Sequence, residues 1–474
     1  MNLFNNYIAL QKALEQGTYT CVDIVKHYLS NINKQKHLNA FIEVFEEESI
    51  ERAKLIDEKI KNKKAGKLAG MVIGIKDNIA YKGHKVSASS KILDNFESIY
   101  SATVIERLLA EDAIIIGRCN CDEFAMGASN ETSVYGPVLN AANNEYVPGG
   151  SSGGCAVAVQ AKLCHAAIGS DTGGSIRQPA SFCGVVGLKP TYGRISRWGL
   201  LAYASSFDQI GPISQSVEDA ALLLEVMAGA DEHDATISTK AVEKYSEINT
   251  DVAPTKIAYL KECFGEGVDP EVKEALYTWM EKLKKEGHEF VEVSFPYLDY
   301  LVPTYYVLTT AEASSNLSRF QGLQLGHRTS EKGDLEVLFK KSRTEGFGKE
   351  VKRRIMLGTF VLSSDYYDAY YTKAQKVRRI ITDKTNDILK DFEYIITPTT
   401  PTTAFKFGEK SKDPVAMYLA DIFTVQANIC GLPAISIPVA THSNGLSIGL
   451  QLMSSVFKEK ELLNFAAYSQ SKHL

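Results

Sequence analysis

The sequence has little of what marks several large protein classes. Across its 474 residues no window approaches about 18 uncharged apolar positions, so we expect no membrane-spanning helix. Residues 1–6 lack the basic stretch and the long apolar run of a signal peptide. No Gly-Lys-Ser or Gly-Lys-Thr occurs, which excludes the usual phosphate-binding loop. These absences predict a soluble, cytoplasmic protein that holds no nucleotide itself.

Charge and cysteine content limit the partners further. The chain has 52 Lys and Arg against 57 Asp and Glu, a formal net charge of −5, so it has no basic field with which to grip nucleic acid. Of its 8 cysteines only Cys119 and Cys121 lie close together, and one C-x-C pair is weak support for a metal site. The other cysteines stand in apolar or glycine-rich stretches, as buried thiols do in reducing compartments. We expect no metal ion.

Helix and strand signals alternate along the chain. Thr20 and Asp23 resemble a capping box at the start of an amphipathic helix. Apolar runs predict strands at 71–75, 113–117, 163–168, 256–260, 289–293, 394–396 and 434–437. Helical patterns occupy 46–64, 102–110, 216–227, 270–286 and 416–429, and a further helix begins after Gly153. This alternation predicts an α/β fold with a central mixed β-sheet, helices on both faces, and catalytic groups at strand ends.

No linker, repeat or low-complexity segment divides the chain. Its composition, 45% hydrophobic and 23% charged, is ordinary for a globular protein. We therefore predict one catalytic domain over residues 1–474. The stretch around 298–382 is expected to form a mostly helical subdomain that covers the site.

Two glycine- and serine-rich segments, residues 148–154 and 171–177, carry the most information about chemistry. Consecutive glycines let a substrate approach the main chain closely, and successive free N–H groups can bind an anion. Lys76 follows the predicted strand 71–75 and supplies an amine. A lysine, two serines and a donor-rich loop are the parts needed for acyl transfer without histidine. The sequence therefore indicates an amide hydrolase.

Other interpretations of these residues stay open at this point. The run 150–154 also satisfies G-x-S-x-G, the nucleophile elbow of α/β-hydrolases, with Ser152 at its centre. That class needs a later histidine, and most candidates lie in charged or polar stretches: His233, His288, His327, His442 and His473. Both segments could also be simple tight turns. Lys76 could be the buried ion-pair partner of Asp77.

Lys76 and the two glycine-serine runs together resemble the amidase signature family, and the resemblance extends over nearly the whole chain. Three further stretches, 311–317, 350–359 and 413–425, are similar to the tRNA-dependent amidotransferase subgroup of that family. The resemblance implies Ser175 as the nucleophile that attacks the side-chain amide of glutamine. Ser151, preceded by a cis peptide bond, would relay protons between Ser175 and Lys76.

The chemistry sets conditions on these residues. Lys76 can serve as a base only as the neutral amine, which burial at a strand end favours. The backbone N–H groups of one turn are expected to form the oxyanion hole: Thr172, Gly173, Gly174 and Ser175. Ser152 would be a supporting hydroxyl. Asp171 and Arg177 would brace the loop.

Free glutamine carries an α-carboxylate and an α-ammonium, so its pocket needs one cation and one anion. Arg354 resembles the carboxylate-binding arginine of the family, and Asp421 the partner of the ammonium group. For Arg354 a solvated helix charge is the alternative, since two basic residues precede it. Further pocket residues are expected to be Tyr305 or Tyr306, Met126 and Gly127. Small departures from the family pattern at Cys121, Ala128 and Cys155 leave the pocket shape open.

The resemblance also implies partners. The chain would be the glutaminase component of a heterotrimer that converts Glu-tRNA(Gln) into Gln-tRNA(Gln). A B subunit would carry ATP, Mg²⁺ and tRNA, a small C subunit would wrap the contact, and this chain would need no cofactor. Ammonia would leave inward past small and polar side chains behind the loops. The alternative is a stand-alone amidase acting on small amides.

Overall fold

The computed structural model describes residues 6–410 and 413–473. Its centre is an 11-stranded sheet in the order β1-β3-β2-β4-β6-β5-β10-β11-β9-β7-β8. The strands are β1 (Phe41–Val44), β2 (Val72–Lys76), β3 (Ile114–Cys119), β4 (Ala166–Asp171), β5 (Val186–Lys189), β6 (Gln209–Ser214), β7 (Lys256–Leu260), β8 (Glu289–Val293), β9 (Tyr394–Pro398), β10 (Ala434–Thr441) and β11 (Ser447–Met453). Parallel pairs such as β2–β4 stand beside antiparallel pairs such as β4–β6, so the predicted mixed sheet is confirmed.

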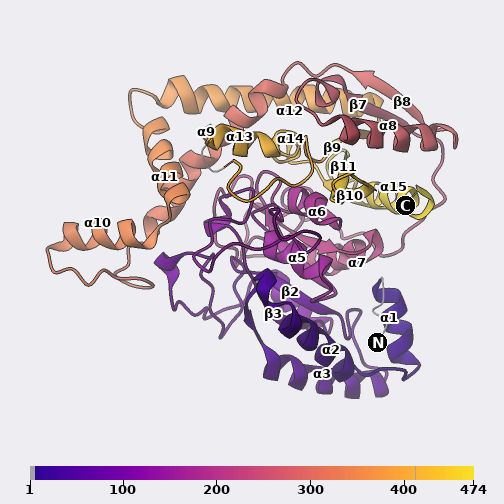
Figure 1. Ribbon diagram of the computed structural model, residues 1–474, viewed down its shortest axis with the longest axis horizontal. Coiled ribbons are helices and arrows are strands. Elements are labelled where there is room, and N and C mark those ends of the chain that lie inside the picture. The colour runs from indigo at the N-terminus through magenta and orange to yellow at the C-terminus, as the bar shows by residue number, and fades with distance from the viewer. Residues whose placement is uncertain (1–5, 411–412, 474) are drawn as a thin grey trace.

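Helices flank this sheet along its whole length (Figure 1). They are α1 (Tyr7–Glu15), α2 (Cys21–Lys34), α3 (Glu46–Lys61), α4 (Thr103–Ala110), α5 (Gly153–Gln160), α6 (Arg177–Cys183), α7 (Val217–Met227), α8 (Pro270–Lys284), α9 (Leu298–Asn316), α10 (Leu335–Gly346), α11 (Lys349–Val361), α12 (Lys373–Asp391), α13 (Pro414–Tyr418), α14 (Val425–Cys430) and α15 (Glu459–His473). The stretch predicted to be mostly helical contains α9, α10, α11 and the first half of α12. Whether it forms a separate subdomain stays a prediction.

The predicted helix start at Thr20 is confirmed. The Thr20 side chain accepts from the Asp23 N–H, and the Asp23 carboxylate accepts from the Thr20 N–H, which completes a capping box at the N-terminus of α2. Several predicted bounds differ, and two of these differences lie beside the glycine-serine segments. The strand expected at 163–168 begins at Ala166, because Leu163 and Cys164 still belong to the turn after α5.

The helix expected at 416–429 is broken into α13, a short 3-10 turn η7 (Leu419–Asp421) and α14. The interruption has a local cause. The Thr424 hydroxyl bonds the main-chain oxygens of Asp421 (2.9 Å) and Gly173 (2.7 Å), so this segment follows the catalytic loop instead of a continuous helix.

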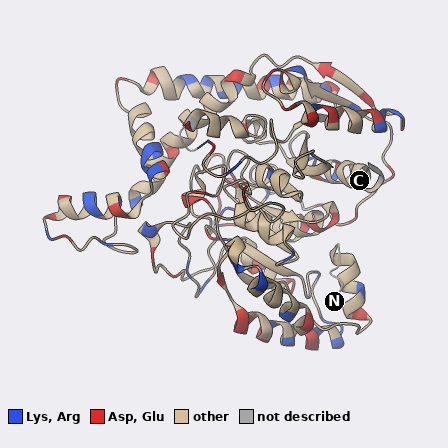
Figure 2. Cartoon of the chain, viewed as in Figure 1, with Lys and Arg blue, Asp and Glu red and all other residues tan. Residues whose placement is uncertain are grey.

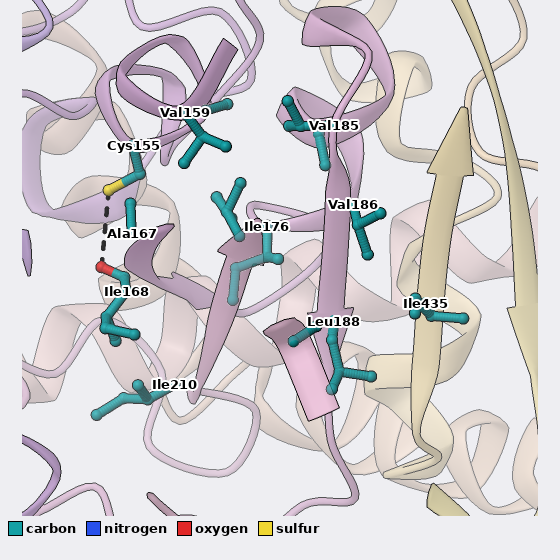
Figure 3. Packing of buried hydrophobic residues seen from close by; sticks show 14 of the residues in the cluster. Cys155, Val159, Ala167, Ile168, Ile176, Val185, Val186, Leu188, Ile210 and Ile435 are labelled. Atoms are coloured by element: carbon teal, nitrogen blue, oxygen red, sulfur yellow. Dashed lines mark hydrogen bonds between the residues drawn. The ribbon is translucent and has the colours of Figure 1, made fainter. Parts of the chain in front are cut away.

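The core lies directly behind the two glycine-serine segments. Strands β2, β3 and β4 are buried along their full length. Figure 3 shows Ile176, near the end of the second segment, among the apolar side chains of the neighbouring strands. Cys155 of α5 bonds the Ile168 oxygen of β4 at 3.6 Å. The loops are therefore anchored at both ends in close-packed interior.

No helix within residues 6–410 and 413–473 is both long enough and apolar enough to cross a bilayer. All eight cysteines are free thiols, seven of them buried. In the same described residues, no group of three or more His, Cys, Asp or Glu side chains could hold a metal ion.

Candidate active site

Lys76 lies where two neighbouring parallel strands end. It is the last residue of β2, and β4, which pairs with β2 in parallel, ends at Asp171. Because carboxyl ends of parallel strands share one edge of a sheet, Lys76 and the start of the second glycine-serine segment meet there. The first segment reaches the same edge from the N-terminus of α5.

The Lys76 amine is completely buried among hydroxyl groups. Its Nζ lies 2.7 Å from Ser151 Oγ, 2.9 Å from Ser152 Oγ and 3.0 Å from Ser170 Oγ. Burial lowers the pKa of Lys76, which favours the neutral amine that a base requires.

Asp77 points to different partners from Lys76. Its carboxylate forms an ion pair with Arg118 and accepts from the Ser87 hydroxyl at 2.6 Å. The alternative in which Lys76 is merely the ion-pair partner of Asp77 is therefore wrong.

Ser151 and Ser175 enter the site from the two segments. The peptide bond between Gly150 and Ser151 is cis, as the resemblance implies. The Ser152 N–H donates to the main-chain oxygen of Ser175 at 3.1 Å, which holds the segments side by side. Among the described residues no hydrogen bond joins the Ser175 hydroxyl to Ser151 or Lys76, so the complete relay stays a prediction.

Ser152 has the wrong neighbours for an α/β-hydrolase nucleophile. Its hydroxyl lies against Lys76 and donates to the Ser170 main-chain oxygen at 3.1 Å. Within the described residues no histidine bonds to it, and that class requires one as the base. The structure favours a supporting role for Ser152.

The loop after β4 is braced by a buried ion pair. Arg177 donates to both oxygens of Asp171 at 3.0 Å, and further to Asn428 and Gln451. Burial raises the pKa of Asp171, but the Arg177 guanidinium outweighs this effect and holds that pKa at about 2. The bracing role predicted for this pair agrees with the geometry.

One predicted oxyanion donor needs correction. The Gly174 N–H donates to Asp171 Oδ1 at 2.8 Å and is therefore occupied. In the part of the chain that the structure describes, the N–H groups of Thr172, Gly173 and Ser175 donate to no protein atom. These three N–H groups remain free to bind a developing oxyanion, and their role as the oxyanion hole stays a prediction.

Arg354 is buried, so the alternative of a solvated helix charge is wrong. Its guanidinium donates from Nε to Glu350 at 2.8 Å and from Nη1 to the Tyr203 hydroxyl at 3.0 Å. The rings of Tyr306 and Tyr418 lie 5.1 and 5.6 Å from it. Arg354 and Gly127 line one cavity of about 290 Å³. The remaining guanidinium N–H groups are available to an anion in that cavity.

Asp421 is a buried carboxylate with an unsatisfied atom. Its Oδ1 has no hydrogen-bond partner among the described residues. Burial and the nearby Asp171 raise the pKa of Asp421 well above its usual value. A buried oxygen without a partner is costly, so a cationic ligand at this position would be favoured. Neither Asp421 nor Ser175 is among the described residues that line the cavity beside Arg354.

Tyrosines 305 and 306 take different places. A Cβ on Gly173 would lie 2.7 Å from the Tyr305 hydroxyl, so Tyr305 packs directly on the catalytic loop. Tyr306 stacks on Tyr418, beneath Arg354. Met126 is fully buried.

Several residues of this site were not predicted from the sequence. Ser170 touches Lys76 and was detectable as a polar residue within the apolar strand that ends at Asp171. Glu350 stands one helical turn before Arg354, a spacing typical of ion pairs on a helix. Gln178 accepts from the Gly150 N–H and donates to the Ala128 oxygen, and no local signal marked it.

A family model described as Amidase matches residues 23–463. The A subunit of glutamyl-tRNA(Gln) amidotransferase from Chlorobium phaeobacteroides is 51% identical over 470 residues, 98% of this chain and 99% of that protein. The protein of the same name from Koribacter versatilis is 50% identical over 461 residues, 97% and 96% of the two chains. The crystal structure of the Thermotoga maritima counterpart matches with a TM-score of 0.80 at 42% identity, covering 95% of this chain and 92% of that one. This extent of agreement shows that the chain belongs to the amidase signature family.

Proposed function

We propose that this chain is the glutamine-hydrolysing component of a tRNA-dependent amidotransferase. The observation that carries the proposal is the fully buried Lys76 amine within 2.7 Å of the Ser151 hydroxyl, beside the loop that bears Ser175. The names of relatives at about half identity support the assignment to an amidotransferase.

In the proposed mechanism Ser175 Oγ attacks the side-chain carbonyl carbon of glutamine. Its proton passes through Ser151 to the neutral Lys76 amine, while the N–H groups of Thr172, Gly173 and Ser175 receive the oxyanion. Collapse of the tetrahedral intermediate breaks the C–N bond, and the proton returns through Ser151 to the departing ammonia. The remaining glutamyl ester is then hydrolysed by water to glutamate, with the same groups acting in reverse order.

Substrate choice follows from the two charged groups of the pocket. The free edge of Arg354 would take the α-carboxylate of glutamine, and the unpartnered oxygen of Asp421 its α-ammonium. Both groups are buried, so each interaction is strong and a ligand that lacks either charge leaves a buried group uncompensated.

Ammonia released at Ser175 would be used on Glu-tRNA(Gln) by other polypeptides. The relatives are named as one subunit of an amidotransferase, which supports a complex. We propose that the complex contains a B subunit with ATP, Mg²⁺ and tRNA and a smaller C subunit. We propose a cytoplasmic location, which eight free thiols suit.

Ammonia release from L-glutamine tests this proposal. Ser175→Ala, Ser151→Ala and Lys76→Ala should each lower the rate by about 10³-fold or more, because the three groups act as a unit. Ser152→Ala should retain measurable activity. Near-normal rates in any of the three variants would contradict the mechanism, and faster turnover of neutral amides than of glutamine would favour a stand-alone amidase.

A further inference from the structure

Glu123 is a buried carboxylate for which the mechanism above has no use. It is 3% exposed. Its two oxygens accept from the Gly348 N–H at 2.9 and 3.1 Å, and one also accepts from the Ser90 hydroxyl at 2.5 Å. Glu123 belongs to a short 3-10 turn, η3 (Glu123–Ala125), two residues before Gly127, which lines the cavity beside Arg354.

The partner of this carboxylate is the residue just before the helix that carries Arg354. Gly348 is the N-cap of α11, and no side chain of its own segment caps that helix. Glu123 supplies the missing acceptor. Burial raises the pKa of Glu123 to about 7, and the Gly348 N–H acts against this rise by favouring the ionised carboxylate. Glu350 and Arg354 follow in the first two turns, so the position of this N-terminus determines where the guanidinium lies.

The surrounding contacts show that the two segments meet closely. Phe124 packs against Phe320 and Phe347 at centroid distances of 5.3 and 5.7 Å. Glu123, Gly348 and Arg354 line the same cavity of about 290 Å³. In Figure 1, α11 stands between α10 and α9, at one end of the molecule. Glu123 thus lies where the catalytic loops meet α11, beside the aromatic contacts of Phe124.

Glycine at 348 is explained by this contact alone. Its φ of −70° is open to any residue, so no backbone requirement selects glycine. A Cβ there would lie 2.3 Å from Glu123 Oε2. The carboxylate therefore occupies the space that a side chain at 348 would need.

We propose that Glu123 is a positioning residue that holds the N-terminus of α11 against the pocket wall and thereby places Arg354 for the α-carboxylate of glutamine. The inference rests on the proposed function for the identity of the ligand. It assigns Glu123 to recognition of one charged group of the substrate and not to the chemical step.

Equilibrium binding to the full-length chain in the Ser175→Ala background separates this role from catalysis. The two ligands are L-glutamine and 4-aminobutanamide, which is glutamine without its α-carboxylate. Glu123→Ala should raise the Kd of glutamine about fivefold, the order expected when a helix loses its cap, and leave the Kd of 4-aminobutanamide unchanged. Glu123→Gln keeps an acceptor oxygen and should recover part of the loss. Asp269→Ala, which removes the side-chain cap of α8, is the matched control and should change neither Kd.

Gly348→Ala tests the same contact from the opposite side. It should weaken glutamine binding in the wild-type context but cost little more in the Glu123→Ala context, where the carboxylate is gone. The inference would be overturned if Glu123→Ala weakened the binding of both ligands equally or changed neither Kd, or if the effects of the two substitutions were additive. If the Glu123→Ala chain does not fold, the effect of Gly348→Ala on the two Kd values decides. Ammonia release from glutamine by the wild-type chain is measured in a separate experiment. If the binding results are as expected but the wild-type chain releases no ammonia, the proposed function is refuted and the positioning role of Glu123 is not.

Discussion

At the scale of single residues, the site depends on charged groups placed where water is excluded. Lys76 is wholly buried and has hydroxyl groups, not a carboxylate, within hydrogen-bond distance. Such an environment favours the neutral amine, which can act as a base. It disfavours the protonated amine, which is the form that Lys76 has in the unfolded chain at neutral pH. The residue is therefore expected to serve catalysis at a cost to folding.

Lys76→Met should abolish ammonia release and raise the free energy of unfolding at pH 7. In the folded chain the pKa of Lys76 is lowered from its ordinary value. At any pH below that ordinary value the unfolded chain therefore binds the proton more tightly than the folded chain does, and the lysine destabilises the fold. The gain in stability over wild type should shrink as the pH rises toward about 10.4, where the unfolded lysine also loses its proton. Urea unfolding at several pH values measures this, and a variant less stable than wild type at pH 7 would contradict it. For the same reason wild-type kcat/KM should fall as acid protonates the amine.

Arg354 and Asp421 lead to a prediction about specificity. Arg354→Ala should raise the KM for L-glutamine roughly 10- to 100-fold and change kcat much less, since the carboxylate contact exists in both ground and transition states. Arg354→Lys should not rescue it, because lysine lacks the planar fork. Asp421→Asn should likewise raise KM. Arg379→Ala on α12, whose exposed side chain pairs with Asp383, is the control and should leave KM unchanged.

At the scale of elements, strongly patterned segments were predictable, and short or weakly patterned strands were not. Strands β7 and β8 fall on the residues predicted from their apolar runs, and α7 lies within the predicted range 216–227, with Ser216 as its N-cap. Strands β1, β5, β6 and β11 were missed. In β6 the pair Gly211-Pro212 is typical of a turn by local rules, but the close approach of the Leu188 oxygen leaves no room for a Cβ at Gly211.

Tertiary contacts also decided which site residues could be found. Lys76, Ser151 and Ser175 lie in short segments whose composition alone suggested chemistry. Glu123 and Gln178 act through partners remote in the chain, and nothing local distinguishes them from surface polar residues. The same holds for the break between α13 and α14, which depends on the Thr424 contact with the catalytic loop.

Gly211→Ala tests the explanation for β6. A Cβ there would lie 2.1 Å from the Leu188 main-chain oxygen of the adjacent strand β5, so the two strands must move apart. We expect the substitution to lower the free energy of unfolding by about 1–3 kcal/mol. Gly265→Ala, whose Cβ would meet only the Glu262 oxygen at 3.3 Å, should change stability by no more than about 0.5 kcal/mol. Urea unfolding of both variants decides, and equal stability would show that the space at Gly211 is not needed.

At the scale of the whole molecule, charges of both signs are interspersed over the described helices and loops (Figure 2). The net charge of −5 gives no field that would attract the polyanionic backbone of tRNA. The sequence also has no Gly-Lys-Ser or Gly-Lys-Thr segment for the phosphates of ATP. The proposed reaction needs both ligands, so its second half is expected on another polypeptide.

The purified chain alone, given L-glutamine, ATP, Mg²⁺ and Glu-tRNA(Gln), should therefore form no Gln-tRNA(Gln). It should release ammonia slowly, and the rate should rise when the other components of the complex are added with ATP and Glu-tRNA(Gln), because coupling avoids wasted glutamine. The Ser175→Ala chain in the same reconstituted complex is the control: it should support amidation from added ammonium but not from glutamine, since only the supply of ammonia is lost. Chromatographic separation of the amino acids released from the tRNA measures the product. Gln-tRNA(Gln) formed by the chain without a second polypeptide would show that the ATP and tRNA sites lie within these 474 residues and would refute the division of labour.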